Sequence, residues 1–99
     1  MLLGVDSTRK GGLMPRVSTF YGIAIYLYYR DHPPPHFHAI YGDDEAVVEI
    51  ASGAVLAGRL PRRARALVED WLAAHRAEVQ HNWDLAAAGQ PLVPVPPLD

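Results

Sequence analysis

Histidine and proline are concentrated in one short segment of the chain, which reads His32-Pro33-Pro34-Pro35-His36-Phe37-His38. Side chains alternate between the two faces of an extended strand, so His36 and His38 share one face and Phe37 lies on the other. Two imidazoles one residue apart can bind a single metal ion, or they can act as an acid–base pair, because histidine titrates near neutral pH. The proline run before His36 is a stiff connection, which suits a preorganised site and equally suits a plain loop.

The residues that follow predict a hairpin. The polar run 42–45 (Gly-Asp-Asp-Glu) is typical of a turn between strands over residues 36–41 and 46–51. With Tyr41 placed opposite Ala46, one face of the hairpin is wholly apolar; it carries Phe37, Ala39, Tyr41, Ala46, Val48 and Ile50. A register slipped by one residue would mix the two faces, so we prefer this pairing.

This register brings a carboxylate to the histidine pair. Glu49 lies opposite His38 and diagonal to His36, and directly opposed side chains have Cβ atoms about 5 Å apart. The sequence therefore predicts one exposed polar site formed by His36, His38 and Glu49, which His32 or Asp31 can join. No cofactor is expected other than a divalent metal ion: these groups can bind Zn²⁺ or Fe²⁺, or they can perform general acid–base catalysis without one. The alternative is a polar outer face of a sheet whose His–Glu pair has no activity.

Arginines form a second candidate site before a predicted helix. Arg59, Arg62, Arg63 and Arg65 are four of the nine Lys and Arg residues. Positive charge is unfavourable near a helix N-terminus, and Glu69 offsets part of this cost by pairing with Arg65. We interpret Arg59, Arg62 and Arg63 as a binding surface for RNA or DNA phosphates or for an acidic protein. The alternative is a solvated helix face.

The strongest strand pattern covers residues 17–30, which are rich in β-branched and aromatic side chains. Its core face is expected to carry Tyr21, Ile23, Ile25, Leu27 and Tyr29. Tyr26 and Tyr28 point the other way and form an exposed aromatic stripe, which can stack bases or contact a protein unless the C-terminal tail covers it.

A helix is predicted from Pro61 to about residue 88, with Gly89 as its C-terminal cap and a kink near residues 81–82. Its apolar residues recur every three or four positions, and Trp71 lies in the middle of this stripe as the predicted core anchor. A short fourth strand over residues 54–57 completes the sheet. The fold class is α+β, an antiparallel β-meander of three to four strands packed by one long or two consecutive C-terminal helices.

Composition sets the remaining limits. The chain has 99 residues, of which 49% are hydrophobic and 20% charged, with a net charge of −2 and no cysteine. This charge argues against a broad nucleic-acid-binding surface, and no apolar run approaches the length of a membrane span. We expect a cytoplasmic protein with a flexible extension over residues 1–13, a single domain over 14–90 and an extended proline-rich tail over 91–99.

The chain resembles the domain of unknown function family 4160. The resemblance lies in Phe20-Tyr21-Gly22-Ile23, in the His32–Ala39 segment and in the helix from Trp71 to Trp83, and it covers about residues 14–95. It implies a small prokaryotic interaction or regulatory protein that is one half of a two-gene, toxin–antitoxin-like module. Its expected partner is a small protein encoded by a neighbouring gene, with RNA, DNA or a second copy of the chain as further candidates. The alternative is an enzyme, either a ribonuclease-like toxin or a metal-dependent hydrolase that uses the histidine site.

Overall fold

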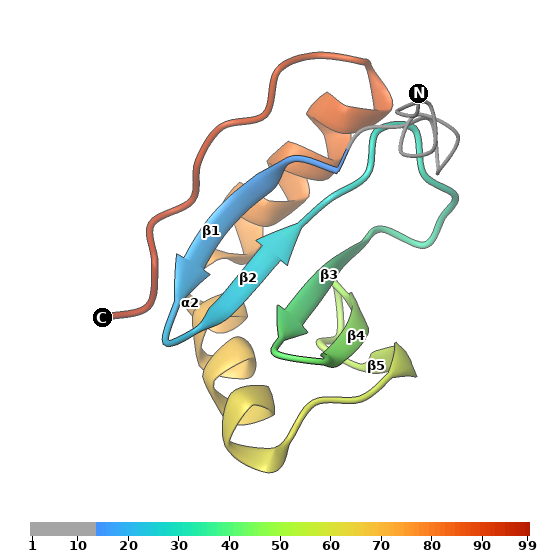
Figure 1. Ribbon diagram of the computed structural model, residues 1–99. Helices are drawn as coiled ribbons and strands as arrows, with labels where there is room; N and C mark the ends of the chain where they lie inside the picture. Colours follow the sequence, from blue (N-terminus) through green and yellow to red (C-terminus); the bar gives the residue numbers. More distant parts are fainter. Residues whose placement is uncertain (1–13) are drawn as a thin grey trace, which may run out of the picture.

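The computed structural model describes residues 14–99, which form an antiparallel sheet and one long helix (Figure 1). Within this range the sheet has five strands in the sequence order β1-β2-β3-β4-β5. The strands are β1 (Arg16–Phe20), β2 (Ile23–Tyr26), β3 (His36–Tyr41), β4 (Asp44–Glu49) and β5 (Val55–Gly58), and the helix is α2 (Arg62–Ala87). The α+β class and the helical packing are confirmed, but the sheet has five strands rather than three to four.

The fifth strand arises because residues 17–30 are not one continuous strand. Tyr21 and Gly22 have φ angles of 50° and 78°, and Phe20 pairs directly with Ile23. Two central residues with positive φ make a two-residue turn whose twist matches that of the flanking strands. Glycine adopts positive φ angles freely, whereas tyrosine does so at a steric cost. Tyr-Gly is therefore not one of the dipeptides, such as Asn-Gly, that mark a two-residue turn in a sequence.

The β3–β4 hairpin is tighter than the sequence predicted. Tyr41 lies opposite Asp44 rather than Ala46, so the turn consists of Gly42, with a φ of 60°, and Asp43. The predicted register was therefore wrong by two residues. A shift of two preserves the faces, because the side-chain period of a strand is two. The apolar face is accordingly buried as predicted, except for Tyr41, which is 40% exposed at the sheet end.

Trp71 of α2 anchors the helix to this face, as predicted. Its side chain is fully buried, with ring centroids 5.4 Å from Phe20 and 5.6 Å from Phe37. The helix departs from helical geometry at His75 (φ −130°) rather than at residues 81–82. Gly89 is the predicted cap: it has a φ of 72°, and the bonds Gly89 N–H to Ala86 O and Gln90 N–H to Leu85 O form a Schellman pair.

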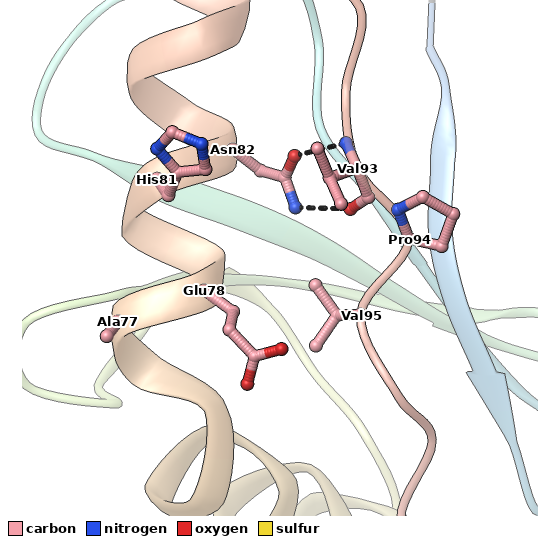
Figure 2. A pocket seen from close by; sticks show the side chains of 7 residues that line it. All are labelled: Ala77, Glu78, His81, Asn82, Val93, Pro94 and Val95. Atoms are coloured by element: carbon pink, nitrogen blue, oxygen red, sulfur yellow. Dashed lines mark hydrogen bonds between the residues drawn. The ribbon is translucent and has the colours of Figure 1, made fainter.

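The proline-rich tail runs in an extended path beside β1 and α2 (Figure 1). The Asn82 side chain both donates to and accepts from the backbone of Val93, each bond being 2.7 Å long, at one wall of a largely apolar pocket of about 280 Å³ (Figure 2). The Val95 N–H donates to Val17 O at 2.8 Å, and Trp71 Nε1 donates to Pro96 O at 2.9 Å. The tail therefore occupies the outer edge of β1.

Two further sequence predictions concern the N-terminal extension and membrane spans. The proposed flexible extension over residues 1–13 lies outside it. Among residues 14–99, no helix has the length and hydrophobicity that crossing a membrane requires.

We predict that Asn82→Ala lowers the free energy of unfolding by about 2–4 kcal/mol, because two backbone groups of Val93 lose their partners in a partly buried position. Asn82→Asp keeps the acceptor but places a buried carboxylate oxygen against the Val93 carbonyl oxygen, so its loss should be at least as large. Denaturant unfolding followed by tryptophan fluorescence measures both. The exposed neighbour His81→Ala serves as control, and equal stability of all three variants would contradict this role for Asn82.

Candidate functional site

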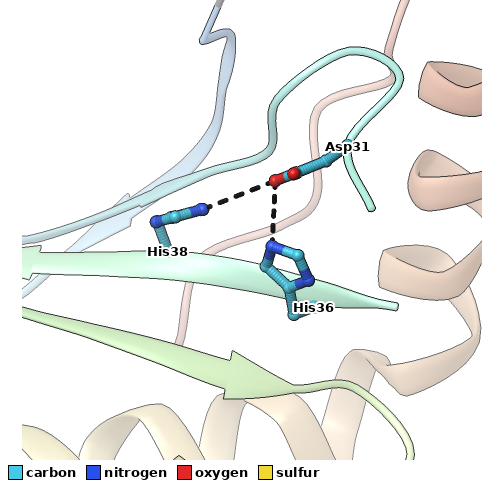
Figure 3. A group of neighbouring side chains, drawn as sticks. All are labelled: Asp31, His36 and His38. Carbon is cyan, nitrogen blue, oxygen red and sulfur yellow. Dashed lines mark hydrogen bonds and ion pairs between the residues drawn. The ribbon is translucent and has the colours of Figure 1, made fainter. Parts of the chain in front are cut away.

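The side chains of Asp31, His36 and His38 converge on one point above the start of β3 (Figure 3). The Nε2 atom of His36 lies 2.9 Å from Asp31 Oδ2, and the Nε2 atom of His38 lies 3.8 Å from the same oxygen. One ligand atom from each residue lies within 4.8 Å of the other two. We call these three residues the His-Asp cluster.

The second nitrogen of each imidazole is already engaged. His36 Nδ1 lies 2.7 Å from the Pro34 carbonyl oxygen, and His38 Nδ1 lies 2.9 Å from Glu45 Oε2. A carbonyl can only accept a hydrogen bond, and so can an ionised carboxylate, so Nδ1 is the donor in both histidines. Both Nε2 atoms consequently face the Asp31 carboxylate, and neither needs to carry a hydrogen to satisfy the Nδ1 contacts.

Asp31 is positioned by the segment between β2 and β3. The preceding Arg30 has a φ of 52°, and its N–H donates to Ala86 O at 3.3 Å. Its guanidinium lies against Gly89, where any Cβ would collide with it. This cation therefore sits at the C-terminus of α2, where exposed carbonyls and the helix dipole favour positive charge. Asp31 follows directly, and its Oδ1 accepts the His32 N–H at 2.8 Å.

The His-Asp cluster is buried, whereas the sequence predicted an exposed site. His36 is 3% exposed, His38 is 5% exposed, and the Asp31 side chain is 4% exposed. Tyr28 packs edge-on against His38 at 4.6 Å, and Trp83 of α2 packs against His36 at 5.1 Å. Both covering residues come from outside the β3–β4 hairpin, so its register could not reveal them.

Tyr28 is therefore not part of an exposed aromatic stripe, and that prediction was wrong. Its ring is buried because it covers His38, while Tyr26 is half-buried opposite His38 on the neighbouring strand. The predicted stacking platform for bases is thus reduced to one half-buried ring.

The predicted position of Glu49 also needs correction. Glu49 lies opposite His36 in the register, and its carboxylate accepts a hydrogen bond from the Ser52 hydroxyl. The carboxylates that contact the histidines are those of Asp31, which the sequence indicated as an additional member of the site, and Glu45, which was expected in the turn. The sequence signal for Glu45 was the alternative two-residue turn at Gly42-Asp43, which moves Glu45 into β4.

The arginine surface formed by Arg59, Arg62 and Arg63 is exposed, at the junction between β5 and α2. It follows directly on β5, and the Arg59 N–H donates to Glu45 O at 2.9 Å. Arg65 pairs with Glu69 at 3.3 Å, as the sequence indicated. Beside this surface, Leu56 of β5 is 47% exposed.

Comparison with known proteins identifies a family without assigning an activity. The model of the family described as "Domain of unknown function (DUF4160)" matches residues 22–84. The match lies within residues 14–95, where the sequence resemblance was expected, and it includes the whole His-Asp cluster. No similar protein was found among curated proteins or solved structures.

We predict that Glu45→Ala lowers the free energy of unfolding by about 1–2 kcal/mol, because it leaves the buried His38 Nδ1–H without its acceptor. Glu49→Ala should change stability less and should leave the imidazole NMR signals of His38 in place. Denaturant unfolding and long-range ¹H–¹⁵N spectra of both variants make the comparison. A His38 signal that responds to Glu49→Ala and not to Glu45→Ala would contradict the observed pairing.

Proposed function

This chain belongs to the DUF4160 family, and we propose that it is a small interaction protein whose open sheet edge takes up an extended segment of an acidic partner protein. The family resemblance supports the finer part of the proposal. It implies that the partner is encoded by a neighbouring gene and that the pair forms a toxin–antitoxin-like regulatory module in the prokaryotic cytoplasm.

The observation that carries the proposal is the difference between the two edges of the sheet. The β1 edge is occupied by the tail, through the bond from Val95 N–H to Val17 O. The β5 edge lies at the other end of the strand order and has no strand beside it among residues 14–99. Unpaired N–H and C=O groups on an edge strand are a template for another extended chain. Natural edge strands are usually protected by charge or proline, but β5 reads Val-Leu-Ala-Gly.

Charge supports an acidic partner. Arg59 follows β5 directly, and Arg62 and Arg63 begin α2 three residues later; all three are exposed. An acidic segment added along β5 would meet these guanidinium groups at the strand end. Arginine binds carboxylates through two parallel hydrogen bonds, which gives the contact orientation as well as attraction.

Burial of the histidines argues against the ribonuclease alternative. A general acid or base must come within hydrogen-bond distance of the proton that it transfers. His36 and His38 are almost fully covered by Tyr28, Trp83 and the segment that carries Asp31. An RNA backbone could not reach either Nε2 atom without displacing these groups.

We predict that Leu56→Glu weakens the complex with the product of the neighbouring gene by about tenfold or more, because it places a negative charge on the apolar edge that an acidic partner must contact. Val93→Glu is the matched control, since Val93 is similarly exposed but lies on the tail beside the opposite edge. Co-purification from the native host followed by titration calorimetry measures both. Unchanged affinity of Leu56→Glu in a folded protein would exclude the β5 edge.

We predict that reversal of Arg59, Arg62 and Arg63 to Glu weakens the same complex by about tenfold or more and flattens its salt dependence, because the three groups contribute screened electrostatic attraction. Arg16→Glu, at the exposed first residue of β1, is the control for a charge reversal elsewhere on the surface. Calorimetry at several salt concentrations measures the slope. A triple variant with an unchanged slope would leave the arginines as a solvated face, and retained protein binding with lost RNA binding would replace the proposed partner by RNA.

A further inference from the structure

We propose that Asp31, His36 and His38 form a binding site for one divalent transition-metal ion, with Zn²⁺ as the best fit, bound by Asp31 Oδ2 and by the Nε2 atoms of both histidines. This site is independent of the β5 edge and of the partner proposed above. The reason to place an ion here is that the ring nitrogens and the carboxylate of this cluster have too few hydrogen atoms to form hydrogen bonds with one another.

In the cluster, lone pairs on the two Nε2 atoms face lone pairs on the Asp31 carboxylate, and there are too few hydrogen atoms to bridge them all. Because both Nδ1 atoms donate, to Pro34 O and to Glu45 Oε2, a neutral imidazole carries its lone pair on Nε2. Both lone pairs then face the Asp31 carboxylate, which also offers only lone pairs. At 2.9 Å, the contact between His36 Nε2 and Asp31 Oδ2 is repulsive unless a cation lies between or beside the two atoms.

A proton can fill this role for one histidine only. If His36 is an imidazolium, its Nε2–H donates to Asp31 and the pair is satisfied. His38 remains unexplained, since its Nε2 lies 3.8 Å from the carboxylate, outside hydrogen-bond distance, and has no hydrogen-bond partner among the described residues. Its side chain is only 7% exposed, and a buried polar atom without a partner is costly. A metal ion satisfies both Nε2 atoms and the carboxylate at once.

The distances suit such an ion. With metal–ligand bonds of about 2.0–2.2 Å, two ligand atoms lie about 3.0 Å apart at a right angle and about 3.4 Å apart at the tetrahedral angle. The observed separations of 2.9 Å and 3.8 Å from Asp31 Oδ2 bracket the tetrahedral value. All three ligand atoms lie within 4.8 Å of one another, so binding an ion requires the two imidazoles to move closer to a common centre.

The surroundings match those of metal-binding histidines. Each Nδ1 donates to an oxygen, which fixes the ring orientation and raises the basicity of the Nε2 ligand. Tyr28 and Trp83 form an aromatic wall that excludes water from the two rings. Glu45 is thus a positioning residue, because it would act on the metal through His38.

The ligand set favours a borderline ion that accepts imidazole and carboxylate together, which describes Zn²⁺ and Fe²⁺ better than Mg²⁺ or Ca²⁺. Three protein ligands leave a further coordination position. His32, 72% exposed and with its Nε2 3.6 Å from Asp31 Oδ1, stands on the solvent side of the cluster, where it or a water molecule can supply the next ligand. The ion would tie the β2–β3 segment to β3.

The first experiment titrates the tag-free, chelator-treated full chain with Zn²⁺ by calorimetry and records its melting temperature. The expected result is one ion per chain and, at about 100 times Kd, a melting temperature higher by about 10 °C or more. Titration with Co²⁺ should give visible d–d bands of a low-symmetry nitrogen–oxygen site. Absence of binding and of any thermal shift would overturn the proposal.

Near-isosteric variants then locate the ion. Asp31→Asn and His38→Gln should each weaken Zn²⁺ binding by about 100-fold or more, and Glu45→Ala by about 10–100-fold, as outer-shell partners do. The matched control His81→Gln removes an exposed histidine and should leave the affinity unchanged. Binding that survives Asp31→Asn and His38→Gln but is lost in His81→Gln would place the ion elsewhere and overturn the assignment.

A measurement on the unaltered chain covers the case in which a variant fails to fold. Long-range ¹H–¹⁵N spectra report which ring nitrogens of His36 and His38 carry a hydrogen. Zn²⁺ should shift both Nε2 resonances together and keep both Nδ1 atoms protonated. A Zn²⁺ titration that moves only the signals of other histidines would show that the cluster is not the site.

Discussion

The contact between Trp71 and Phe37 is the constraint on which the rest of this structure depends. It fixes which face of β3 enters the core, since the two rings lie 5.6 Å apart and both are fully buried. Because side chains alternate along a strand, Phe37 in the core forces both flanking histidines onto the opposite face. The apolar core and the His-Asp cluster are thus two faces of one central strand, and a change that loosens the first also moves the second.

The sequence could predict those features that depend only on the alternation of side chains along a strand. The apolar face of the β3–β4 hairpin and the shared face of His36 and His38 survive a register error of two residues. The prediction of which glutamate contacts His38 does not survive this error, because it depends on the length of the turn. With a two-residue turn, the contact is made by Glu45 instead of Glu49. The β1–β2 turn was missed for a similar reason, since tyrosine at a positive φ is not a turn signal in sequence.

Burial of the histidines lay beyond sequence reasoning, and the sequence indicated Asp31 only as an additional member of the site and not as the carboxylate between the two imidazoles. The covering rings come from Tyr28 and from Trp83, which is 47 residues away in the chain from His36 (83 − 36). Asp31 reaches the histidines through a segment without periodicity, whose path is fixed by Arg30 at the C-terminus of α2. Such helix-end contacts use backbone carbonyls, which every residue has, so they leave no signal in the sequence.

Glu45 is the residue that both proposals share. Its carboxylate accepts the His38 Nδ1–H, its carbonyl accepts the Arg59 N–H, and its carbonyl lies so close to Gly58 that no Cβ fits there. One residue of β4 therefore holds His38 through its side chain and the start of the arginine surface through its backbone. The Glu45→Ala variant removes the acceptor of His38 but keeps the backbone carbonyl that Arg59 contacts, so it tests the cluster and not the arginine surface. Asp31 belongs to the cluster and Leu56 to the β5 edge, so variants at these two positions distinguish a failure of one proposal from a failure of the other.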